Sequence, residues 1–432
     1  MNQFQDRIQI CIAKIIQHNI ELKNIFEEIY QQGGRVLLVG GAVRDCLMGC
    51  IGSDLDFEVY HLTFNQLQDI LEKFGKVSFV GKSFGVLRLH SLNADWAIPR
   101  MDSYGRKPEV ELNPNMSFKD AFRRRDLTVN AMGIDVHSFE LIDPYNGMID
   151  LQKRVLKSPD LTFFIQDPLR LFRVMQFAAR FEMNVDVSLN RVCETMDISN
   201  VSPERIWQEF SKLFLKSQKP SIGFKWLAEI NRLAEIFPGI DFDNQLYESL
   251  DCLACQDGLS SDRKLIGLWA FLMQKNNGSV VSNLSAEEKI SSVQLKFFTD
   301  FLKKYIASHD LIHQVSLVSW YLKYIPFLIK ENKDILYRKL AYFLNKELTL
   351  QELSDIAVCW YDQEVVEKFI HGARQAKVLY NPIEPILTGK DLMEYAEGKD
   401  LGDLLKKSYD IQLEKSIHDK QQLISLVLDQ NK

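Results

Sequence analysis

Two aspartates near the N-terminus have the spacing of a metal site. Asp54 and Asp56 stand two residues apart where a strand is predicted to begin, and residues i and i+2 of a strand point to the same face. Adjacent carboxylates repel each other unless a hard cation neutralises them, and Mg²⁺ is the usual occupant of such a pair. An isolated Asp-x-Asp is more often a solvated strand end, so the neighbouring sequence must decide between these interpretations.

A glycine turn precedes the two carboxylates. The apolar run 36–39 predicts a short buried strand, and Gly40 and Gly41 follow it directly. Because glycine has no Cβ, the backbone N–H groups of such a turn can approach a bulky anion such as a phosphate. Arg44 and Asp45 lie in the first turn of the helix predicted next. A phosphate-binding turn followed by a two-carboxylate site predicts a nucleotide-transfer enzyme that uses metal-ion chemistry.

Arginines that could contact a nucleotide follow later in the chain. The run 123–125 contains three adjacent arginines, ending in Arg125, and Asp126 comes next. A solvated helix cap is one interpretation, but with a phosphate site upstream we favour a triphosphate or ribose contact. Asp95, on a later predicted strand, is a candidate third carboxylate, and a surface aspartate is an equally good interpretation.

A predicted helix over 167–181 carries a second polar face. Asp167, Arg170 and Arg173 step by three residues and therefore share one side of this helix, with Asp167 as the expected N-cap and Pro168 in the first turn. An exposed acid–arginine pair normally adds little stability. Beside a nucleotide site, the same pair can match the donor and acceptor pattern of a base edge.

The bulk composition describes a globular chain of more than one domain. It has 432 residues, 46% of them hydrophobic and 25% charged, and a net charge of −6. We expect no signal peptide and no membrane span. The seven cysteines show no paired framework, which predicts a reduced, cytoplasmic protein. Cys252 and Cys255 form a C-x-x-C that we interpret as a coincidence of helix spacing rather than a metal or redox site.

The pattern of apolar residues predicts an α+β head followed by helices. Helices over 4–31 precede the first strand, another spans 63–74, and strands follow at 77–80, 86–89 and 96–98, giving a small mixed sheet with helices on one face that ends near residue 150. Within the head, 82–85 favours a hairpin turn over a second phosphate turn, and 101–116 favours a mobile loop over the site. From about 236 onward, apolar-periodic helices are expected over 246–255, 264–273, 295–305, 311–329, 335–345, 350–360 and 364–376.

These motifs, in this order, closely resemble the class II tRNA nucleotidyltransferase and bacterial poly(A) polymerase family, within the DNA polymerase beta superfamily. The resemblance is strong over about 35–235, and the tail segments 387–392 and 401–405 also look like this family. It rests on the segments 40–45, 54–56, 124–132, 167–173 and 202–209, the last of which looks like the family's neck helix.

The resemblance implies a polymerase-beta-like nucleotidyltransferase head with a small mixed sheet, followed by an all-α neck, body and tail. The implied parts are N-terminal helices over 1–34, a catalytic head over 35–160, a neck for base recognition over 161–235, a helical body over 236–370 and a tRNA-binding tail over 371–432. In the tail, we favour contacts of basic residues with the tRNA backbone, at Lys390, Lys399, Lys406, Lys407 and Lys415. In the body, ordinary solvated helix faces are favoured over an RNA path for Lys303, Lys304, Lys323, Lys330, Lys333 and Arg338.

The resemblance also implies a role for each motif residue. Asp54 and Asp56 would hold Mg²⁺, while Asp167 and Arg170 would act as a protein template for CTP and ATP. Phosphates and ribose would be bound by the remaining members of the site: Gly40, Gly41, Arg44, Asp45, Arg125, Asp126, Asn130 and Arg173. The implied reaction adds CCA to the 3′ end of tRNA, and within the family a CC-adding enzyme or a poly(A) polymerase are alternatives. A non-catalytic RNA-binding protein is the alternative from a different class.

Four departures from the family pattern bear on this prediction. Gln166 stands where the family usually has Glu, and Gln176 stands where many members have another phosphate-side Arg. The loop 101–116 is a few residues shorter than is common in the family. The resemblance links this loop to the switch from C to A addition, so a CC-adding enzyme is retained as an alternative. Many related enzymes carry a metal-dependent HD phosphohydrolase domain, but no histidine lies between His137 and His309, so the body 236–370 is read as lacking that activity.

Overall fold

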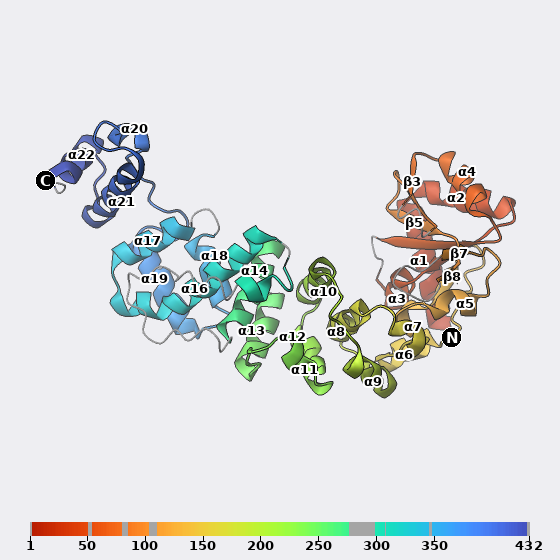
Figure 1. Cartoon of the computed structure of the whole chain (residues 1–432). Coiled ribbons are helices and arrows are strands. Elements are labelled where there is room, and N and C mark those ends of the chain that lie inside the picture. The colour runs from red at the N-terminus through yellow and green to blue at the C-terminus, as the bar shows by residue number, and fades with distance from the viewer. Residues whose placement is uncertain are drawn as a thin grey trace. The chain divides into compact units, whose positions relative to one another are not determined.

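The computed structural model describes residues 2–50, 54–79, 85–102, 110–275, 299–306, 308–344 and 348–429. The chain divides into two compact units, shown as a ribbon in Figure 1: Met1–Leu213 with Ile222–Leu233, and Phe214–Ser221 with Ala234–Lys432. The finer division into five parts stays a prediction. None of the described helices has the length and apolar character that a membrane crossing requires.

The first unit is built on a mixed sheet with the strand order β3-β4-β5-β2-β1-β8-β9. Its central strands β2 and β5 run parallel, whereas β1 is antiparallel to both β2 and β8. The strands are β1 (Arg35–Val39), β2 (Leu55–Tyr60), β3 (Val77–Phe79), β4 (Val86–Leu89), β5 (Ala94–Ala97), β8 (Gly133–Asp135) and β9 (Leu141–Ile142). Two short ladders lie apart from it, β6 (Arg100–Asp102) with β7 (Val110–Leu112) and β10 (Val155–Leu156) with β11 (Asn184–Val185). The predicted head with its small mixed sheet is confirmed.

Both faces of this sheet are covered, because β1 is apolar on both sides. Val36 and Leu38 belong to a core shared with helices α1 (Asn2–His18), α2 (Ile20–Gln31) and α4 (Phe64–Glu72). Leu37 and Val39 point to the opposite face, where they join Phe122 of α5 (Phe118–Arg123). The expectation of helices on one face only was therefore wrong, because it overlooked the short helix α5.

Helix starts follow the local sequence closely, with one correction. Thr63 caps α4 through a capping box with Gln66, as its place before an apolar helix predicts. Helix α8 begins at Leu169, so Pro168 rather than Asp167 occupies the N-cap position. Asp167 still accepts a hydrogen bond from the Leu169 backbone N–H at 3.3 Å. The other helical elements of this region are α3 (Gly41–Leu47), η1 (Thr128–Asn130), α6 (Gly147–Lys153), α7 (Leu161–Phe164), α8 (Leu169–Phe181), α9 (Val187–Thr195), α10 (Pro203–Lys216) and α11 (Ser221–Glu229).

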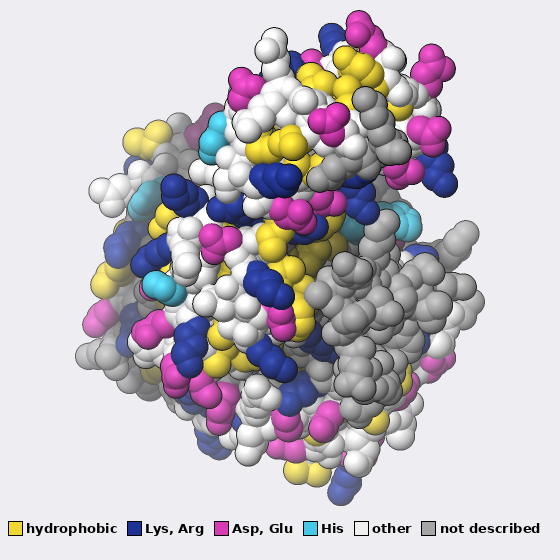
Figure 2. All heavy atoms as spheres, turned by 90° about the vertical axis from the view of Figure 1, so that its left-hand side faces the viewer, with side chains coloured by type: hydrophobic (Ala, Val, Ile, Leu, Met, Phe, Trp, Pro, Cys, Tyr) yellow, Lys and Arg dark blue, Asp and Glu magenta, His cyan; other side chains and the backbone are white. Residues whose placement is uncertain are grey.

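The regular elements of the second unit are all helices among its described residues. Its helices are α12 (Leu233–Ile236), α13 (Asn244–Cys255), α14 (Ser261–Gln274), α16 (His309–Glu331), α17 (Asp334–Leu344), α18 (Leu350–Ala357), α19 (Gln363–Gln375), α20 (Gly389–Leu392), α21 (Gly398–Lys415) and α22 (Lys420–Asp429). They match the predicted ranges, and of the range 295–305 the residues 295–298 lie outside the described residues, 299–302 are helical and 303–305 form a turn. On the face drawn in Figure 2, basic and acidic side chains are interspersed.

The prediction that the cysteines are unpaired was wrong for two of them. Cys252 on α13 and Cys359 after α18 form a disulfide with a Cα–Cα distance of 5.5 Å. Helix packing joins positions 107 residues apart, and no spacing rule reveals such a pair in the sequence. Cys255 is free and exposed, so the C-x-x-C is not one functional unit. Two further predictions fall on residues that the structure does not describe: most of the turn at 82–85, and the central part, 103–109, of the expected loop.

Candidate active site

The glycine turn lies where two chemically active side chains meet. Gly40 has a φ of +74°, which disfavours any residue with a side chain. A Cβ on Gly40 would lie 2.9 Å from Arg125 Nη1 and 3.8 Å from Asp56 Oδ2. On Gly41, a Cβ would lie 3.3 Å from Arg44 Nη2. Residues far apart in the sequence therefore converge on this turn: the two glycines, Arg44, Arg125 and Asp56.

The expected metal-binding carboxylates lie at the entrance to β2. Asp54 precedes the strand and accepts a hydrogen bond from Asn93 Nδ2 at 3.1 Å, while Asp56 pairs in register with Asp95 of the neighbouring strand β5. The Asp56 side chain is exposed at one side, yet protein atoms crowd its carboxyl group. This desolvation, with the nearby carboxylates of Asp95 and Asp54, raises its pKa even though Arg125 opposes the shift. Asp95 itself is bound by Arg88 at 2.6 and 3.0 Å.

This donor set fits a divalent cation that is shared with a ligand. Neighbouring carboxylates raise the pKa of Asp56, and at such a place a positive ion lowers the electrostatic cost. Within the described residues, no group of three or more Asp, Glu, His or Cys side chains has a metal-binding arrangement. Mg²⁺ commonly binds through one or two carboxylates and completes its octahedron with waters and substrate phosphates. Asp54 and Asp56 supply that number, and Asp95 is already held by an arginine.

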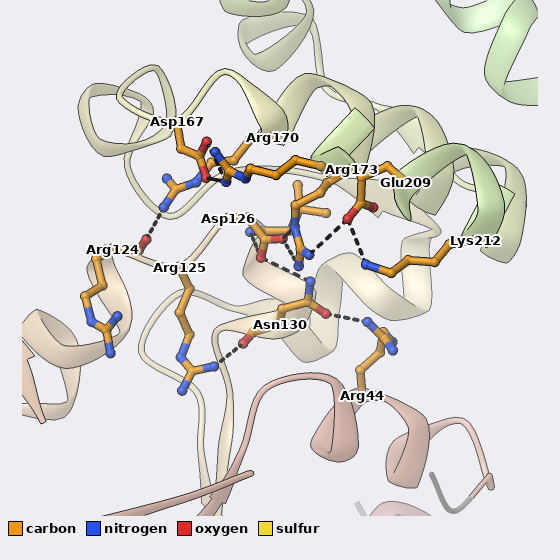
Figure 3. Close-up of polar contacts among 12 residues, drawn as sticks. Arg44, Arg124, Arg125, Asp126, Asn130, Asp167, Arg170, Arg173, Glu209 and Lys212 are labelled. Atoms are coloured by element: carbon orange, nitrogen blue, oxygen red, sulfur yellow. Dashed lines mark hydrogen bonds and ion pairs between the residues drawn. The ribbon is translucent and has the colours of Figure 1, made fainter. Parts of the chain in front are cut away.

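A buried polar network links the head to the helices that follow it (Figure 3). Asp126, only 8% exposed, accepts hydrogen bonds from the Leu127 backbone N–H at 2.8 Å and from Asn130 Nδ2 at 3.1 Å. Its second oxygen accepts two from Arg173, Nε at 2.7 Å and Nη2 at 2.6 Å. Asn130 in turn accepts from Arg44 Nη1 at 2.5 Å. Four residues that the sequence singled out are thus one continuous network.

Electrostatics explain how this network holds a buried charge. Burial alone would raise the pKa of Asp126, but the charge of Arg173 and the hydrogen bond from Asn130 outweigh it and lower the pKa to about 2. Asp126 is therefore ionised at neutral pH, and protein donors bind both of its oxygens. The structure gives Asp126 an internal role in orienting Arg173 and Asn130, while the ribose contact implied by the resemblance stays a prediction.

The network continues into α10 through residues that sequence reasoning missed. Glu209, 2% exposed, lies 3.9 Å from Arg173 Nη1 and accepts a hydrogen bond from Lys212 Nζ at 2.8 Å. On the other side, the Arg44 guanidinium lies over the ring of Phe181 at 4.5 Å. The segment 202–209 resembles a neck helix, and a glutamate at helical spacing within it is the signal that could have identified Glu209.

The two expected base-reading residues lie close together but bind different partners (Figure 3). Asp167 accepts from Arg205 Nη2, at 2.9 Å to one oxygen and 3.1 Å to the other. Arg170 donates to the backbone carbonyls of Phe163 at 2.8 Å and Arg124 at 2.7 Å. Its guanidinium is thus oriented by the backbone, and the carboxylate by an arginine of α10. Arg205 is the second residue that sequence reasoning missed.

The two glutamine departures have separate consequences. Gln166 donates to the carbonyl of Thr162 at 3.1 Å, so it stabilises the turn before α8. Gln176 is 1% exposed and belongs to the buried side of α8, whereas Arg170 and Arg173 are partly exposed. Position 176 is therefore unsuited to an exposed phosphate contact in this chain.

Comparisons with known proteins agree with this geometry. Residues 36–157 match the family model of the poly A polymerase head domain, and residues 194–243 match the model described as the probable RNA and SrmB-binding site of polymerase A. The fold resembles that of the Thermotoga maritima CCA-adding enzyme complexed with tRNA, at 20% identity and a TM-score of 0.64, over 98% of both chains. It also resembles the Bacillus stearothermophilus CCA-adding enzyme in complex with CTP, at 18% identity and a TM-score of 0.67, over 94% of this chain and 96% of that one.

A third solved structure, of a CCA-adding enzyme with ATP, matches at 20% identity and a TM-score of 0.66, over 96% of this chain and 94% of that one. At these identities the structural likeness establishes the fold. The two family models add the identity of the head and of the segment 194–243. Residues 36–157 thus form a poly A polymerase head domain with a polymerase-beta-like fold, and residues 194–243 match the RNA-binding segment of the same polymerases.

Proposed function

We propose that this protein is a template-independent nucleotidyltransferase that adds CCA to tRNA 3′ ends from CTP and ATP with Mg²⁺. The observation that carries the proposal is the convergence over Gly40, where the Asp56 carboxylate and the Arg125 guanidinium both approach the turn. A carboxylate pair beside an arginine is what a metal–triphosphate complex requires, since the acids bind the cation and the arginine binds the phosphates. The solved relatives were captured with tRNA, CTP and ATP, which agrees with these substrates.

In the proposed reaction, the RNA 3′-hydroxyl attacks the α-phosphate in line and pyrophosphate leaves. Asp54 and Asp56 would hold Mg²⁺, which supplies Lewis-acid stabilisation of the phosphate charge and makes the 3′-hydroxyl a better nucleophile. Arg125, beside the glycine turn, neutralises negative charge on the phosphates. Arg44, fixed by Asp45 at 2.7 Å and by Asn130, supports the same end of the site. The chemistry consists of positioning and charge neutralisation, without a covalent enzyme nucleotide.

Base choice would rest on Asp167 and Arg170. Cytosine and adenine both present an exocyclic amino group beside a ring nitrogen acceptor, whereas uracil and guanine present a carbonyl oxygen at that place. A carboxylate accepts from the amino group and a guanidinium donates to the ring nitrogen, so the pair selects CTP and ATP. The backbone carbonyls that hold Arg170 reduce its freedom, which makes it suitable as a template.

RNA would be held by exposed lysines of the tail and by the segment 194–243 that matches the polymerase RNA-binding model. Lys390, Lys399, Lys406 and Lys415 are exposed on or beside α20 and α21. Such contacts bind the phosphate backbone without reading sequence. We further propose that the protein acts in the cytoplasm.

Two alternatives within the family share every residue of this site. A CC-adding enzyme would stop after two cytidines, and a poly(A) polymerase would extend many RNAs with adenosine. A non-catalytic RNA-binding protein is the alternative of another class, and the paired aspartates beside the turn argue against it.

The test uses purified protein, Mg²⁺ and a tRNA that lacks its 3′ CCA. Labelled CTP and ATP are supplied separately and together, and products are resolved at single-nucleotide resolution. Addition of C, C and then A supports the proposal. A stop after two cytidines identifies a CC-adding enzyme, long adenosine tracts on unrelated RNA identify a poly(A) polymerase, and no incorporation supports the binding protein.

A further inference from the structure

A third carboxylate lies on the same face of β2 as the metal-binding pair. Glu58 follows Asp54 and Asp56 at the same two-residue interval, so all three share one strand face. Unlike them, Glu58 is only 2% exposed. A buried carboxylate is costly unless cations and hydrogen bonds compensate for its lost hydration. Glu58 has such compensation, and its partners belong to the candidate active site.

Three side chains surround the Glu58 carboxylate. The Tyr60 hydroxyl donates to Oε2 at 3.0 Å. Two guanidiniums face Oε1, with Arg124 Nη2 at 3.6 Å and Arg125 Nη2 at 3.7 Å. Glu58 is therefore a buried carboxylate in contact with the arginine run.

Arg125 is held only loosely by its other contacts. Its Nη1 donates to the Asn130 carbonyl at 3.4 Å, which is a long hydrogen bond, and its Nε is buried without a hydrogen-bond partner. Its guanidinium stacks over the Phe122 ring at 5.2 Å. The charge of Glu58 is thus a buried electrostatic restraint on this guanidinium, and the charge of Asp56 acts on the same group from the side of the glycine turn.

We propose that Glu58 is a positioning residue, which orients Arg125 toward the triphosphate and offsets one unit of positive charge in the pyrophosphate-binding site. This inference rests on the proposed function and adds a residue that supports it. It implies two separable effects. Orientation favours the transition state, whereas the offset charge weakens ground-state attraction for pyrophosphate and thereby helps its release.

The main test compares Glu58→Gln with Glu58→Asp. Gln has the same shape and still accepts from Tyr60 but lacks the charge, whereas Asp keeps the charge. For Glu58→Gln we expect kcat for nucleotide addition to fall by about tenfold and pyrophosphate to bind about threefold more tightly. Glu58→Asp should restore wild-type pyrophosphate affinity. Pyrophosphate binding is measured by calorimetry with Mg²⁺, without RNA, and this readout does not depend on incorporation.

Two further variants separate positioning from a structural role. Tyr60→Phe removes the hydrogen bond to Glu58 but no charge, so it should leave pyrophosphate affinity unchanged. In an Arg125→Met background, Glu58→Gln should have no further effect on kcat, because the residue through which it acts is absent. Glu140→Gln, on an exposed residue of the same unit, is the surface control.

Several results would overturn the inference. One is an unchanged kcat together with an unchanged pyrophosphate affinity in Glu58→Gln. A second is an equal effect of Glu58→Gln on kcat in the presence and absence of Arg125. A third is tighter binding of pyrophosphate by Tyr60→Phe. If Glu58→Gln fails to fold, Glu58→Asp decides the matter through kcat: its shorter side chain moves the carboxylate away from Arg125, so kcat should fall while pyrophosphate affinity stays at the wild-type value, and an unchanged kcat would overturn the inference. If the wild-type protein adds no nucleotide, the proposed function fails, while calorimetry still reports whether Glu58 controls the charge at Arg125.

Discussion

The two compact units use their positive charges in opposite ways. In the first, Arg44, Arg125 and Arg173 converge from separate segments on one network around Asp126, and Arg125 also faces the glycine turn. In the second, Arg338 donates to the carbonyl of Leu413 at 2.8 Å near the end of α21. The number of cations is thus a poor guide to a binding site, whereas convergence of cations beside carboxylates is a good one.

Arg338 shows what the second unit does with its charges. It also donates to Ser416 Oγ at 3.0 Å and lies 3.7 Å from Asp334, and these contacts satisfy groups at a helix end. Lys333 pairs with Glu331 at 2.9 Å, and burial lowers the pKa of Lys323. These findings agree with the favoured sequence interpretation, in which the cations of the body belong to ordinary helix faces. The hydrogen bonds of Arg338, which lies on α17, also hold the end of α21 against that helix.

The largest effect is expected at the carboxylate pair. Asp54→Ala should reduce nucleotide addition by about a thousandfold, because the metal loses one of its two protein ligands. Asp54 is exposed and precedes β2, so the fold should be retained. Incorporation and thermal unfolding are measured on the same preparation. Asp95→Asn is the matched variant, and its loss should be much smaller since Arg88 already neutralises Asp95. Undiminished activity in Asp54→Ala would refute the assigned site.

The next largest effect is expected on the free energy of unfolding, and it shows whether the network around Asp126 stabilises the fold. The pKa of Asp126, about 2, lies below its unfolded value, so ionised Asp126 stabilises the fold above about pH 4 and this contribution disappears as the pH falls toward 2. Asp126→Asn should therefore lower the free energy of unfolding by about 2 kcal/mol at pH 7. Urea unfolding between pH 7 and pH 2 measures it, and the difference between variant and wild type should shrink in acid.

Asp69→Asn, on an exposed residue of α4, serves as the control for that measurement. A difference between Asp126→Asn and wild type that is independent of pH would contradict the electrostatic role of Asp126. The loss would then have to come from packing alone.

The head was more predictable than the contacts inside the site. The strands and the glycine turn could be predicted because their signals are local: β-branched runs, two-residue alternation, and a glycine at the position where the backbone has a positive φ. The partners Arg205 and Glu209 were not, because they approach from α10, about 40 residues after Asp167 and Arg173 in the chain. Glu58 was missed for another reason: a period-two pattern shows that three acids share a face but not which of them is buried.

A smaller effect is expected on base selection in the neck. Arg170→Ala should reduce discrimination of CTP and ATP against UTP and GTP by about thirtyfold, since it breaks the paired contact that Asp167 and Arg170 make together with the base, which contributes about 2 kcal/mol. Selectivity is obtained from kcat/KM for each nucleotide in single-addition assays. Arg191→Ala, on an exposed residue of α9, should leave selectivity unchanged. Full discrimination in Arg170→Ala would exclude the template role.

The smallest effect returns to the second unit and asks whether its tail differs from its body. Lys406 is exposed on α21, and Lys330 is exposed on α16. If the tail holds tRNA, Lys406→Ala should weaken tRNA binding about threefold and make the dependence of log K on log salt shallower by about one, because one phosphate contact is lost. Lys330→Ala should change neither quantity. Filter binding over a range of salt concentrations measures both, and equal effects of the two substitutions would mean that RNA is attracted by the charge of the unit as a whole rather than by its tail.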